Sequence, residues 1–160
     1  MTDLVKFSEA SSLGLHAMAL VAGAPGRHLS VREIADRLSV SEHYLAKALQ
    51  RLSRAGLLES LRGPAGGFAL RGDPTRITLL EIHEAMDGRV EAAHCLLARE
   101  RTCTHCILGD AVREATAVIV GRLSRTRLSD VAGLLVEPPA LVPLEPPGPD
   151  ARPDGSGPRR

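Results

Sequence analysis

Residues 30–71, SVREIADRLSVSEHYLAKALQRLSRAGLLESLRGPAGGFALR, carry the local signals that decide the fold. Ser30, followed three residues later by Glu33, has the spacing of a capping box, in which each residue satisfies a backbone N–H that the first helical turn leaves free. The helix predicted from this start has one apolar side, made of Ile34, Ala35 and Leu38. Residues 39–41 are too few for anything but a turn between two helices.

A second helix with a polar outer face follows this turn. Ser41 is a favourable N-cap residue, and Glu42 suits the positive end of the helix dipole. Apolar residues recur at helical spacing and predict a buried face made of Leu45, Ala48, Leu49, Leu52 and Ala55. The outward positions hold polar or basic residues, namely His43, Lys47, Gln50, Arg51 and Arg54. Gly56 is placed to end this helix.

Two short segments, LLESL and GFALR, flank the glycine-rich residues 62–67 and predict a β-hairpin whose tip carries Arg62. Two helices joined by a tight turn and followed by such a hairpin predict a mainly α fold, a winged helix-turn-helix with a small β-hairpin wing. Two helices around a turn also occur in proteins that do not bind DNA. The wing with a basic residue at its tip is what favours DNA binding here.

The start of the second helix enters the major groove in helix-turn-helix proteins. We therefore predict DNA contacts at the start of this helix and in the wing, from Ser41, Glu42, His43, Tyr44, Lys47, Arg51, Arg62 and Gly66. Residues 27–76 hold nine Arg or Lys against five Asp or Glu, whereas residues 77–137 hold seven against nine. The basic charge thus lies where phosphate contacts need it. Aromatic residues make up only 2% of the chain, which disfavours a stacking platform for single-stranded nucleic acid.

Further helices are predicted on both sides of this unit. Residues 8–23 have the pattern of an amphipathic first helix. A second capping box, Thr78 with Glu81, starts a helix that stops at Gly88. The wing therefore leads directly into another helical element.

A long helix is predicted for residues 107–123, with a short final helix in residues 127–135. The apolar face of the long helix is broader than one small domain covers, which favours a homodimer. Packing against the first helix would also bury part of this face. The chain then divides into a DNA-binding domain in residues 1–88, a cysteine-bearing segment in 89–106, the dimerisation and final helices in 107–136 and a proline-rich tail predicted to be disordered in 137–160.

The apolar stretch 13–24 is too short to span a bilayer, and it is preceded by mixed charges rather than by a positive segment. We expect a cytoplasmic protein without a membrane segment. Structural disulfides are rare in that compartment, so the three cysteines of the chain need another explanation.

Cys95, Cys103 and Cys106 lie close together in the sequence, and the last two form a C-x2-C pair. Three thiolates can hold an iron–sulfur cluster with a fourth ligand from elsewhere. Alternatively, His94 or His105 can complete a Cys3His zinc site. A third possibility is a thiol sensor without metal, because C-x2-C spacing lowers a thiol pKa.

Four stretches, YLAKALQRLSRAGLLESLRGPAGGFAL, ITLLEIHEAMDG, CILGDAV and TRLSDV, resemble the Rrf-two family of bacterial winged-helix transcription regulators. Iron–sulfur and nitric-oxide-responsive repressors belong to this family. The resemblance covers about residues 6–135, and its wing and ITLLEIHEAMDG segments make it specific.

The resemblance implies a homodimer that holds an iron–sulfur cluster between the DNA-binding domain of one subunit and the long helix of its partner. Cys95, Cys103 and Cys106 fall in the region of the family's ligand cysteines, although their spacing differs from that of the best-known members and leaves the cluster type, 2Fe–2S or 4Fe–4S, open. His16 falls where one branch of the family uses a histidine ligand. The alternative fourth ligands are His94, His105 and Asp110.

The predicted function is a DNA-binding transcriptional regulator, a repressor that binds double-stranded operator DNA under the control of the cluster. A zinc-bound or metal-free thiol regulator is the alternative. An enzyme is not expected, because no pairing of a nucleophile with a base is recognisable and a wing would serve no purpose in one.

Overall fold

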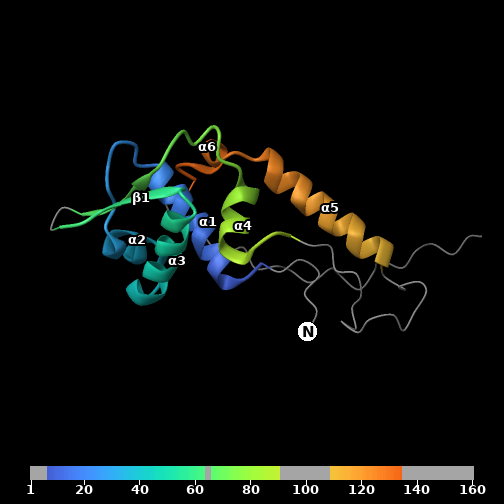
Figure 1. Cartoon of the computed structure of the whole chain (residues 1–160), viewed down its shortest axis with the longest axis horizontal. Helices are drawn as coiled ribbons and strands as arrows, with labels where there is room; N and C mark the ends of the chain where they lie inside the picture. The colour runs from blue at the N-terminus through green and yellow to red at the C-terminus, as the bar shows by residue number, and fades with distance from the viewer. Residues whose placement is uncertain (1–6, 64–65, 91–108, 135–160) are drawn as a thin grey trace, which may run out of the picture.

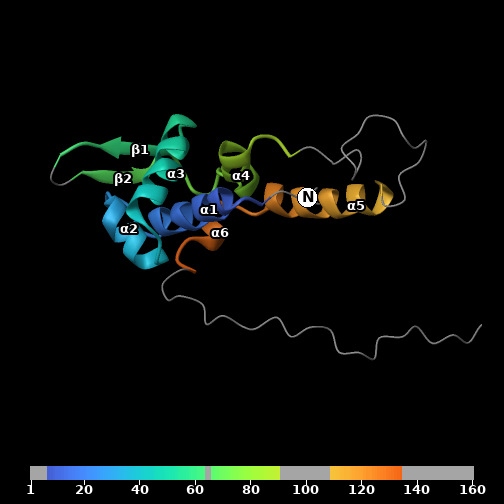
Figure 2. The ribbon, with the colours of Figure 1, turned by 90° about the horizontal axis from the view of Figure 1, so that it is seen from below.

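The computed structural model describes residues 7–63, 66–90 and 109–134. In chain order its elements are α1 (Glu9–Ala22), α2 (Val31–Leu38), α3 (Glu42–Arg54), β1 (Leu58–Leu61), β2 (Gly67–Leu70), α4 (Leu79–Asp87), α5 (Gly109–Arg125) and α6 (Leu128–Val131). Figures 1 and 2 show α1 in the middle, with α2, α3 and the hairpin towards one end and α5 extending away at the other. The predicted mainly α fold with a hairpin wing is confirmed.

Helix α1 is the central element of the core. Its buried positions include Ala17, Met18 and Val21, and it packs against α3, α4, α6 and β2. The side chain of Ser8 caps its start by accepting a hydrogen bond from the Ser11 N–H. Because α1 is enclosed by these elements, its position is defined by contacts with most of the domain.

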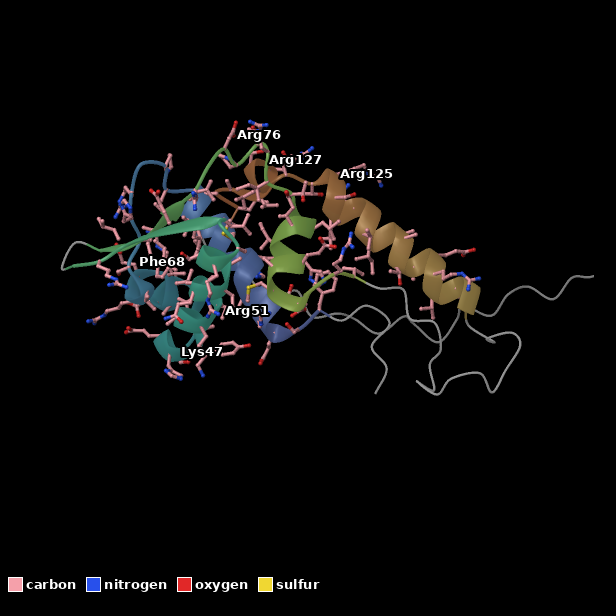
Figure 3. The ribbon with its side chains drawn as sticks, in the orientation of Figure 1. Lys47, Arg51, Phe68, Arg76, Arg125 and Arg127 are labelled. Atoms are coloured by element: carbon pink, nitrogen blue, oxygen red, sulfur yellow. The ribbon has the colours of Figure 1, made fainter. Side chains whose placement is uncertain are left out.

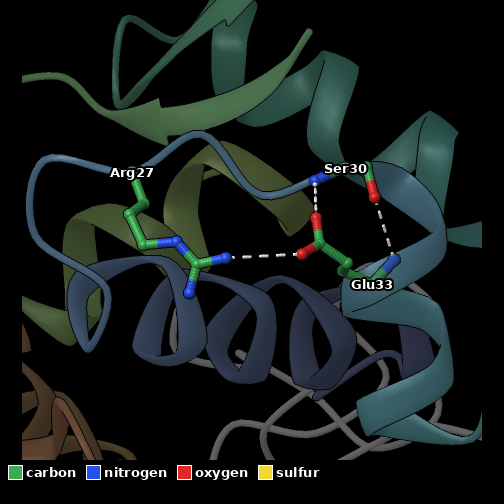
Figure 4. A network of polar contacts seen from close by, with 3 residues as sticks. All are labelled: Arg27, Ser30 and Glu33. Carbon is green, nitrogen blue, oxygen red and sulfur yellow. Dashed lines mark hydrogen bonds and ion pairs between the residues drawn. The ribbon is translucent and has the colours of Figure 1, made fainter. Parts of the chain in front are cut away.

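The helix-turn-helix follows the predicted caps. The Glu33 carboxylate accepts a hydrogen bond from the Ser30 N–H at 2.8 Å, and the Ser30 hydroxyl accepts one from the Glu33 N–H at 3.1 Å. Arg27 adds an ion pair with Glu33 at 3.5 Å (Figure 4). The backbone and side-chain hydrogen bonds to Ser30 hold the pKa of Glu33 below its ordinary value. The turn after α2 closes through Ser39, which has a left-handed backbone with φ of 54°.

Helix α3 buries the predicted apolar face through Leu45, Ala48, Leu49 and Leu52. The prediction that Ala55 also lies in this face is wrong, because Ala55 is exposed. The helix ends at Arg54, and Ala55 is its C-cap residue. The chain turns at Gly56, whose φ of 79° breaks the helical periodicity from which the burial of Ala55 was expected.

The wing is an antiparallel hairpin whose register pairs Leu58 with Leu70 and Leu61 with Gly67. The segment before α2 joins the hairpin, since Leu29 exchanges two backbone hydrogen bonds with Phe68, at 2.9 and 2.8 Å. A Cβ on Gly67 would lie 2.5 Å from the Leu29 carbonyl oxygen. Glycine at this position therefore allows the close approach that ties the wing to the helix-turn-helix.

The second capping box is also confirmed, because Thr78 and Glu81 make both reciprocal bonds at the start of α4. Helix α5 packs against α4, while α6 returns to α1. Leu128 of α6 is fully buried, and its N–H donates to the Ile77 carbonyl at 2.9 Å.

Among the residues that the structure describes, none of the helices has the length and hydropathy needed to span a bilayer.

Candidate DNA interface and ligand site

The outer side of α3 is the first part of the candidate interface. Glu42, His43, Lys47 and Arg51 are exposed, and Tyr44 keeps 38% of its surface exposed. His43, Lys47 and Arg51 follow one another at intervals of four residues, so they form one stripe along the helix. In Figure 3, Lys47 lies on the lower side of the domain, and Arg76 and Arg127 lie on its upper side. Ser41 has a structural task as the N-cap, since its hydroxyl accepts a bond from the Tyr44 N–H at 3.3 Å.

The wing supplies the second part. Arg62 follows β1 directly and is exposed. Near it the Gly66 N–H donates to the Gly63 carbonyl at 2.9 Å, which draws the two sides of the tip together. A Cβ on Gly66 would lie 2.3 Å from the Leu61 carbonyl oxygen, so this tight closure depends on glycine.

In the part of the chain that the structure describes, the basic residues of this surface are not engaged in ion pairs, unlike three cations around α2 and the wing. Within the described ranges, Arg27 pairs with Glu33, Arg32 with Asp36 and His28 with Glu59, while Lys47, Arg51 and Arg62 form no ion pair. Charges without an internal partner are available to phosphate oxygens at no cost of breaking an existing pair. The stripe and the wing tip together therefore have the chemistry of a DNA interface.

His16 lies on the exposed side of α1, and its ring has a defined hydrogen bond. Nδ1 lies 2.7 Å from the Ser12 carbonyl oxygen. A carbonyl only accepts, so Nδ1 carries the proton and the Nε2 lone pair of the neutral ring is left free. Metal-binding histidines are commonly oriented in this way, with the other ring nitrogen donating to a carbonyl or carboxylate.

His16 also lines a surface hollow of about 490 Å³. One wall is the exposed side of α1, and the other is the turn between α2 and α3 with the first turn of α3. The lining residues are Glu9, Ser12, Leu13, His16, Leu38, Val40, Ser41 and Tyr44. The predicted ligand residue and the predicted DNA-reading helix therefore border the same hollow, which the sequence did not indicate.

The cysteine prediction cannot be followed in the same way. Cys95, Cys103 and Cys106, with His94 and His105, lie outside the described residues. Asp110 is in the first turn of α5, and His16 is the predicted ligand whose side chain is described. The described side chains contain no group of three His, Cys, Asp or Glu residues placed to hold a metal ion. The roles of the cysteines stay predictions.

A polar seam between α1 and α4 was not predicted. The Ser8 N–H donates to the Asp87 carboxylate at 3.0 Å, and the Ser8 hydroxyl donates to the other carboxylate oxygen. Deeper in the core, Ser11 Oγ and His83 Nδ1 are hydrogen-bonded at 2.6 Å, and the Phe7 ring lies 4.7 Å from the His83 ring. These partners are more than 70 residues apart in the chain, so no local signal could have revealed them.

Residues 7–133 match the Rrf2 family model, which is described as an iron-dependent transcriptional regulator. BadM of Rhodopseudomonas palustris, named as an HTH-type transcriptional regulator, is 42% identical over 78 residues. That alignment covers 49% of this chain and 50% of BadM, so the chain spans about half the length of this relative.

Solved structures resemble the chain over a greater length. CymR, the global cysteine regulator of B. subtilis, has 27% identity and a TM-score of 0.65, covering 81% of this chain and 97% of CymR. IscR of T. potens has 26% identity and a TM-score of 0.63, covering 78% of this chain and 84% of IscR. The relatives are transcription regulators rather than enzymes. With its winged helix-turn-helix and a family match over residues 7–133, the chain belongs to the Rrf2 family of transcriptional regulators.

Proposed function

We propose that the chain is a homodimeric repressor whose operator binding is controlled by an iron–sulfur cluster that responds to redox state, nitric oxide or iron–sulfur supply. The observation that carries the cluster assignment is the geometry of His16, with its Nδ1–H fixed on the Ser12 carbonyl and its Nε2 free at a surface hollow. The iron-dependent description of the family supports the same assignment.

DNA is read by the exposed stripe on α3 and by the wing. Lys47 and Arg51 contact phosphates or base edges in the major groove, while Arg62 reaches the neighbouring minor groove or backbone. Their exposure and lack of internal ion pairs within the described residues support these roles. His43 and Glu42 lie at the start of α3, where base contacts are expected.

The cluster is held by Cys95, Cys103, Cys106 and His16, with the histidine on one subunit and the cysteines on its partner. A bound cluster supplies a redox-active centre whose potential depends on its ligands. The Ser12 carbonyl orients the His16 ring, and in the neutral tautomer that donates from Nδ1 the Nε2 lone pair is the one available to a metal.

Dimerisation uses α5. Ala111 and Val118 are exposed, Val118 at 70%, and Ala115 between them is half-buried. These residues recur at intervals of four and three along the helix and form one apolar stripe. The proposed occupant of this stripe is a second copy of the chain, because the stripe is apolar and exposed in the single chain. Val118→Glu is therefore expected to shift the protein towards monomer in light scattering.

The test of the cluster is purification without oxygen, followed by visible absorption and assays of iron, sulfide and zinc. The wild-type protein is expected to be brown and to absorb between about 320 and 460 nm, as thiolate-ligated clusters do. Single changes of Cys95, Cys103 or Cys106 to Ala should remove the cluster or make it labile while the helical circular dichroism persists.

His16→Ala should change the cluster spectrum, whereas His43→Ala, a matched change of an exposed histidine on α3, should leave it unchanged. A colourless protein that contains stoichiometric zinc would contradict the cluster and support the zinc-bound regulator. If the purified protein contains no metal and its operator affinity responds to thiol oxidation, the metal-free thiol regulator is the correct alternative.

A further inference from the structure

The last residue of β1 is an exposed leucine. Leu61 keeps 53% of its surface exposed, the largest fraction among the large apolar side chains described in residues 7–90. Figure 2 shows the hairpin projecting beyond the helices, and β1 runs from the buried Leu58 to Leu61. A single exposed leucine is ordinary on a protein surface, so its surroundings must show whether it has a function.

The register of the wing explains why Leu61 is not covered. Successive side chains of a strand point to opposite faces, so Leu61 shares a face with Glu59 rather than with the buried Leu58. Its partner across the hairpin is Gly67, which has no side chain to pack on it. Glycine is required there because a Cβ would lie 2.5 Å from the Leu29 carbonyl oxygen. The close approach that ties the wing to the domain therefore leaves Leu61 uncovered by its cross-strand partner.

The backbone that carries Leu61 is fixed on both sides. The Gly66 N–H donates to the Gly63 carbonyl at 2.9 Å, and a Cβ on Gly66 would lie 2.3 Å from the Leu61 carbonyl oxygen. Leu29 and Phe68 join the wing to the segment before α2 through two backbone hydrogen bonds. A side chain on a fixed backbone has less freedom to lose when it meets a partner.

The next residue in the chain indicates the partner. Arg62 is exposed and forms no ion pair within the described ranges, as expected of a phosphate contact. Leu61 has no group that binds phosphate, and the apolar surface of a duplex lies in the grooves, on sugars and base edges. Because α3 is the element proposed for the major groove, the wing beside it meets the neighbouring minor groove. This groove is roughly 6 Å wide, so a side chain that enters it lies against the base edges.

We propose that Leu61 selects base pairs in this minor groove by covering the position at which guanine carries its exocyclic amino group. Both kinds of base pair present acceptors in the minor groove, and G·C adds this donor. Leucine offers the donor no acceptor, so a G·C pair under Leu61 has one more unsatisfied polar group than an A·T pair. The partner is therefore a duplex with A·T under the wing. The inference rests on the proposed DNA-binding role of the wing and adds a specificity determinant to it.

Base analogues test this selection without changing the edges that α3 contacts. Diaminopurine opposite thymine adds the amino group to the minor groove, inosine opposite cytosine removes it, and both keep the major-groove edge of the base that they replace. An operator is selected from random duplexes with the full-length protein, and each pair flanking the α3 contact is replaced in turn. Under the wing, diaminopurine should weaken wild-type binding about fivefold or more, as one wrong pair usually does, and inosine should bind better than guanine.

Variants then assign the effect to one side chain. Leu61→Ala should bind the A·T operator about three- to tenfold more weakly, because apolar contact is lost, and diaminopurine should cost it little further. Leu61→Met keeps an apolar side chain and should keep the wild-type penalty. Ser60→Ala changes an exposed neighbour on the other face of the strand and is the matched control, with the same penalty as the wild type. Equal penalties in Leu61→Ala and the wild type would overturn the proposal, as would a scan in which no position near the wing is sensitive to the amino group.

Salt dependence separates this selection from the general role of the wing. Leu61→Ala removes no charge, so the slope of log affinity against log salt should stay that of the wild type, while Arg62→Ala should reduce its magnitude by about one. If Arg62→Ala changes neither affinity nor slope, the wing does not contact DNA and both proposals are wrong. If Arg62→Ala behaves as expected and Leu61→Ala keeps the diaminopurine penalty, the wing contacts DNA and only the selection by Leu61 is wrong.

Discussion

Ser11→Ala tests whether the seam between α1 and α4 stabilises the domain as its geometry indicates. Ser11 is completely buried, and His83, its partner at 2.6 Å, is 2% exposed. The substitution keeps the Cβ and the helical propensity while removing the hydroxyl. His83 Nδ1 is then left in the core without a hydrogen-bond partner.

The expected cost follows from that burial. A buried polar group that loses its partner costs about 1–3 kcal/mol, more than the net gain of an average hydrogen bond. For a folded part of this size, each kcal/mol lowers the melting temperature by about 4 °C, so Ser11→Ala should melt roughly 4–12 °C below the wild type. Thermal unfolding followed by far-UV circular dichroism measures this shift.

The neighbouring residue provides the control. Ser12→Ala removes a hydroxyl from the exposed side of the same helix and should leave the melting temperature within about 1 °C of the wild type, as exposed substitutions usually do. The double variant Ser11→Ala/His83→Leu removes both polar partners and should recover part of the loss. If Ser11→Ala and Ser12→Ala melt together, the seam does not stabilise the fold as argued.

Three further changes address the wing, the α2 cap and the return of α6. Gly66→Ala places a Cβ against the Leu61 carbonyl and should weaken operator binding in gel-shift titrations without lowering helix content; wild-type affinity would show that the wing tip is not a contact. Because hydrogen bonds to Ser30 lower the pKa of Glu33, this residue stabilises the fold above the ordinary glutamate pKa of about 4.3 and loses that effect as pH falls. The melting difference between wild type and Glu33→Gln should therefore shrink in acid, and a constant difference from pH 7 to about 3 would contradict this linkage. Leu128→Ala empties a fully buried position and should cost about 2–5 kcal/mol in urea unfolding, whereas Leu134→Ala, at a residue 70% exposed, should cost little; equal losses would mean that α6 does not complete the core.

Local chemistry in the sequence was sufficient for the elements of the DNA-binding unit. Ser30 with Glu33 and Thr78 with Glu81 each form their capping box within four residues, so the bonds that start these helices depend on no distant contact. The hairpin is similarly encoded by two short apolar segments and the glycines between them. Helical spacing alone was not sufficient at the end of α3: Ala55 has the spacing of a buried residue, but the helix ends before it and Ala55 is exposed.

Local sequence motifs also predicted the family, and the match over residues 7–133 confirms that prediction. His16 could be named as a candidate ligand by resemblance alone. Its hydrogen bond to the Ser12 carbonyl is local, but the hollow in front of it exists only because α1 meets the turn at Ser39 in the folded domain.

Tertiary structure alone decided which distant polar residues meet. Nothing in the local sequence pairs Ser11 with His83 or Ser8 with Asp87, because such contacts depend on how α1 and α4 cross rather than on the propensity of either helix. The same is true of Leu29, which joins the wing through two backbone bonds to Phe68. Periodicity and capping are properties of a few successive residues, whereas the hollow that His16 and Tyr44 line from opposite sides is a property of the packed core that holds their helices together.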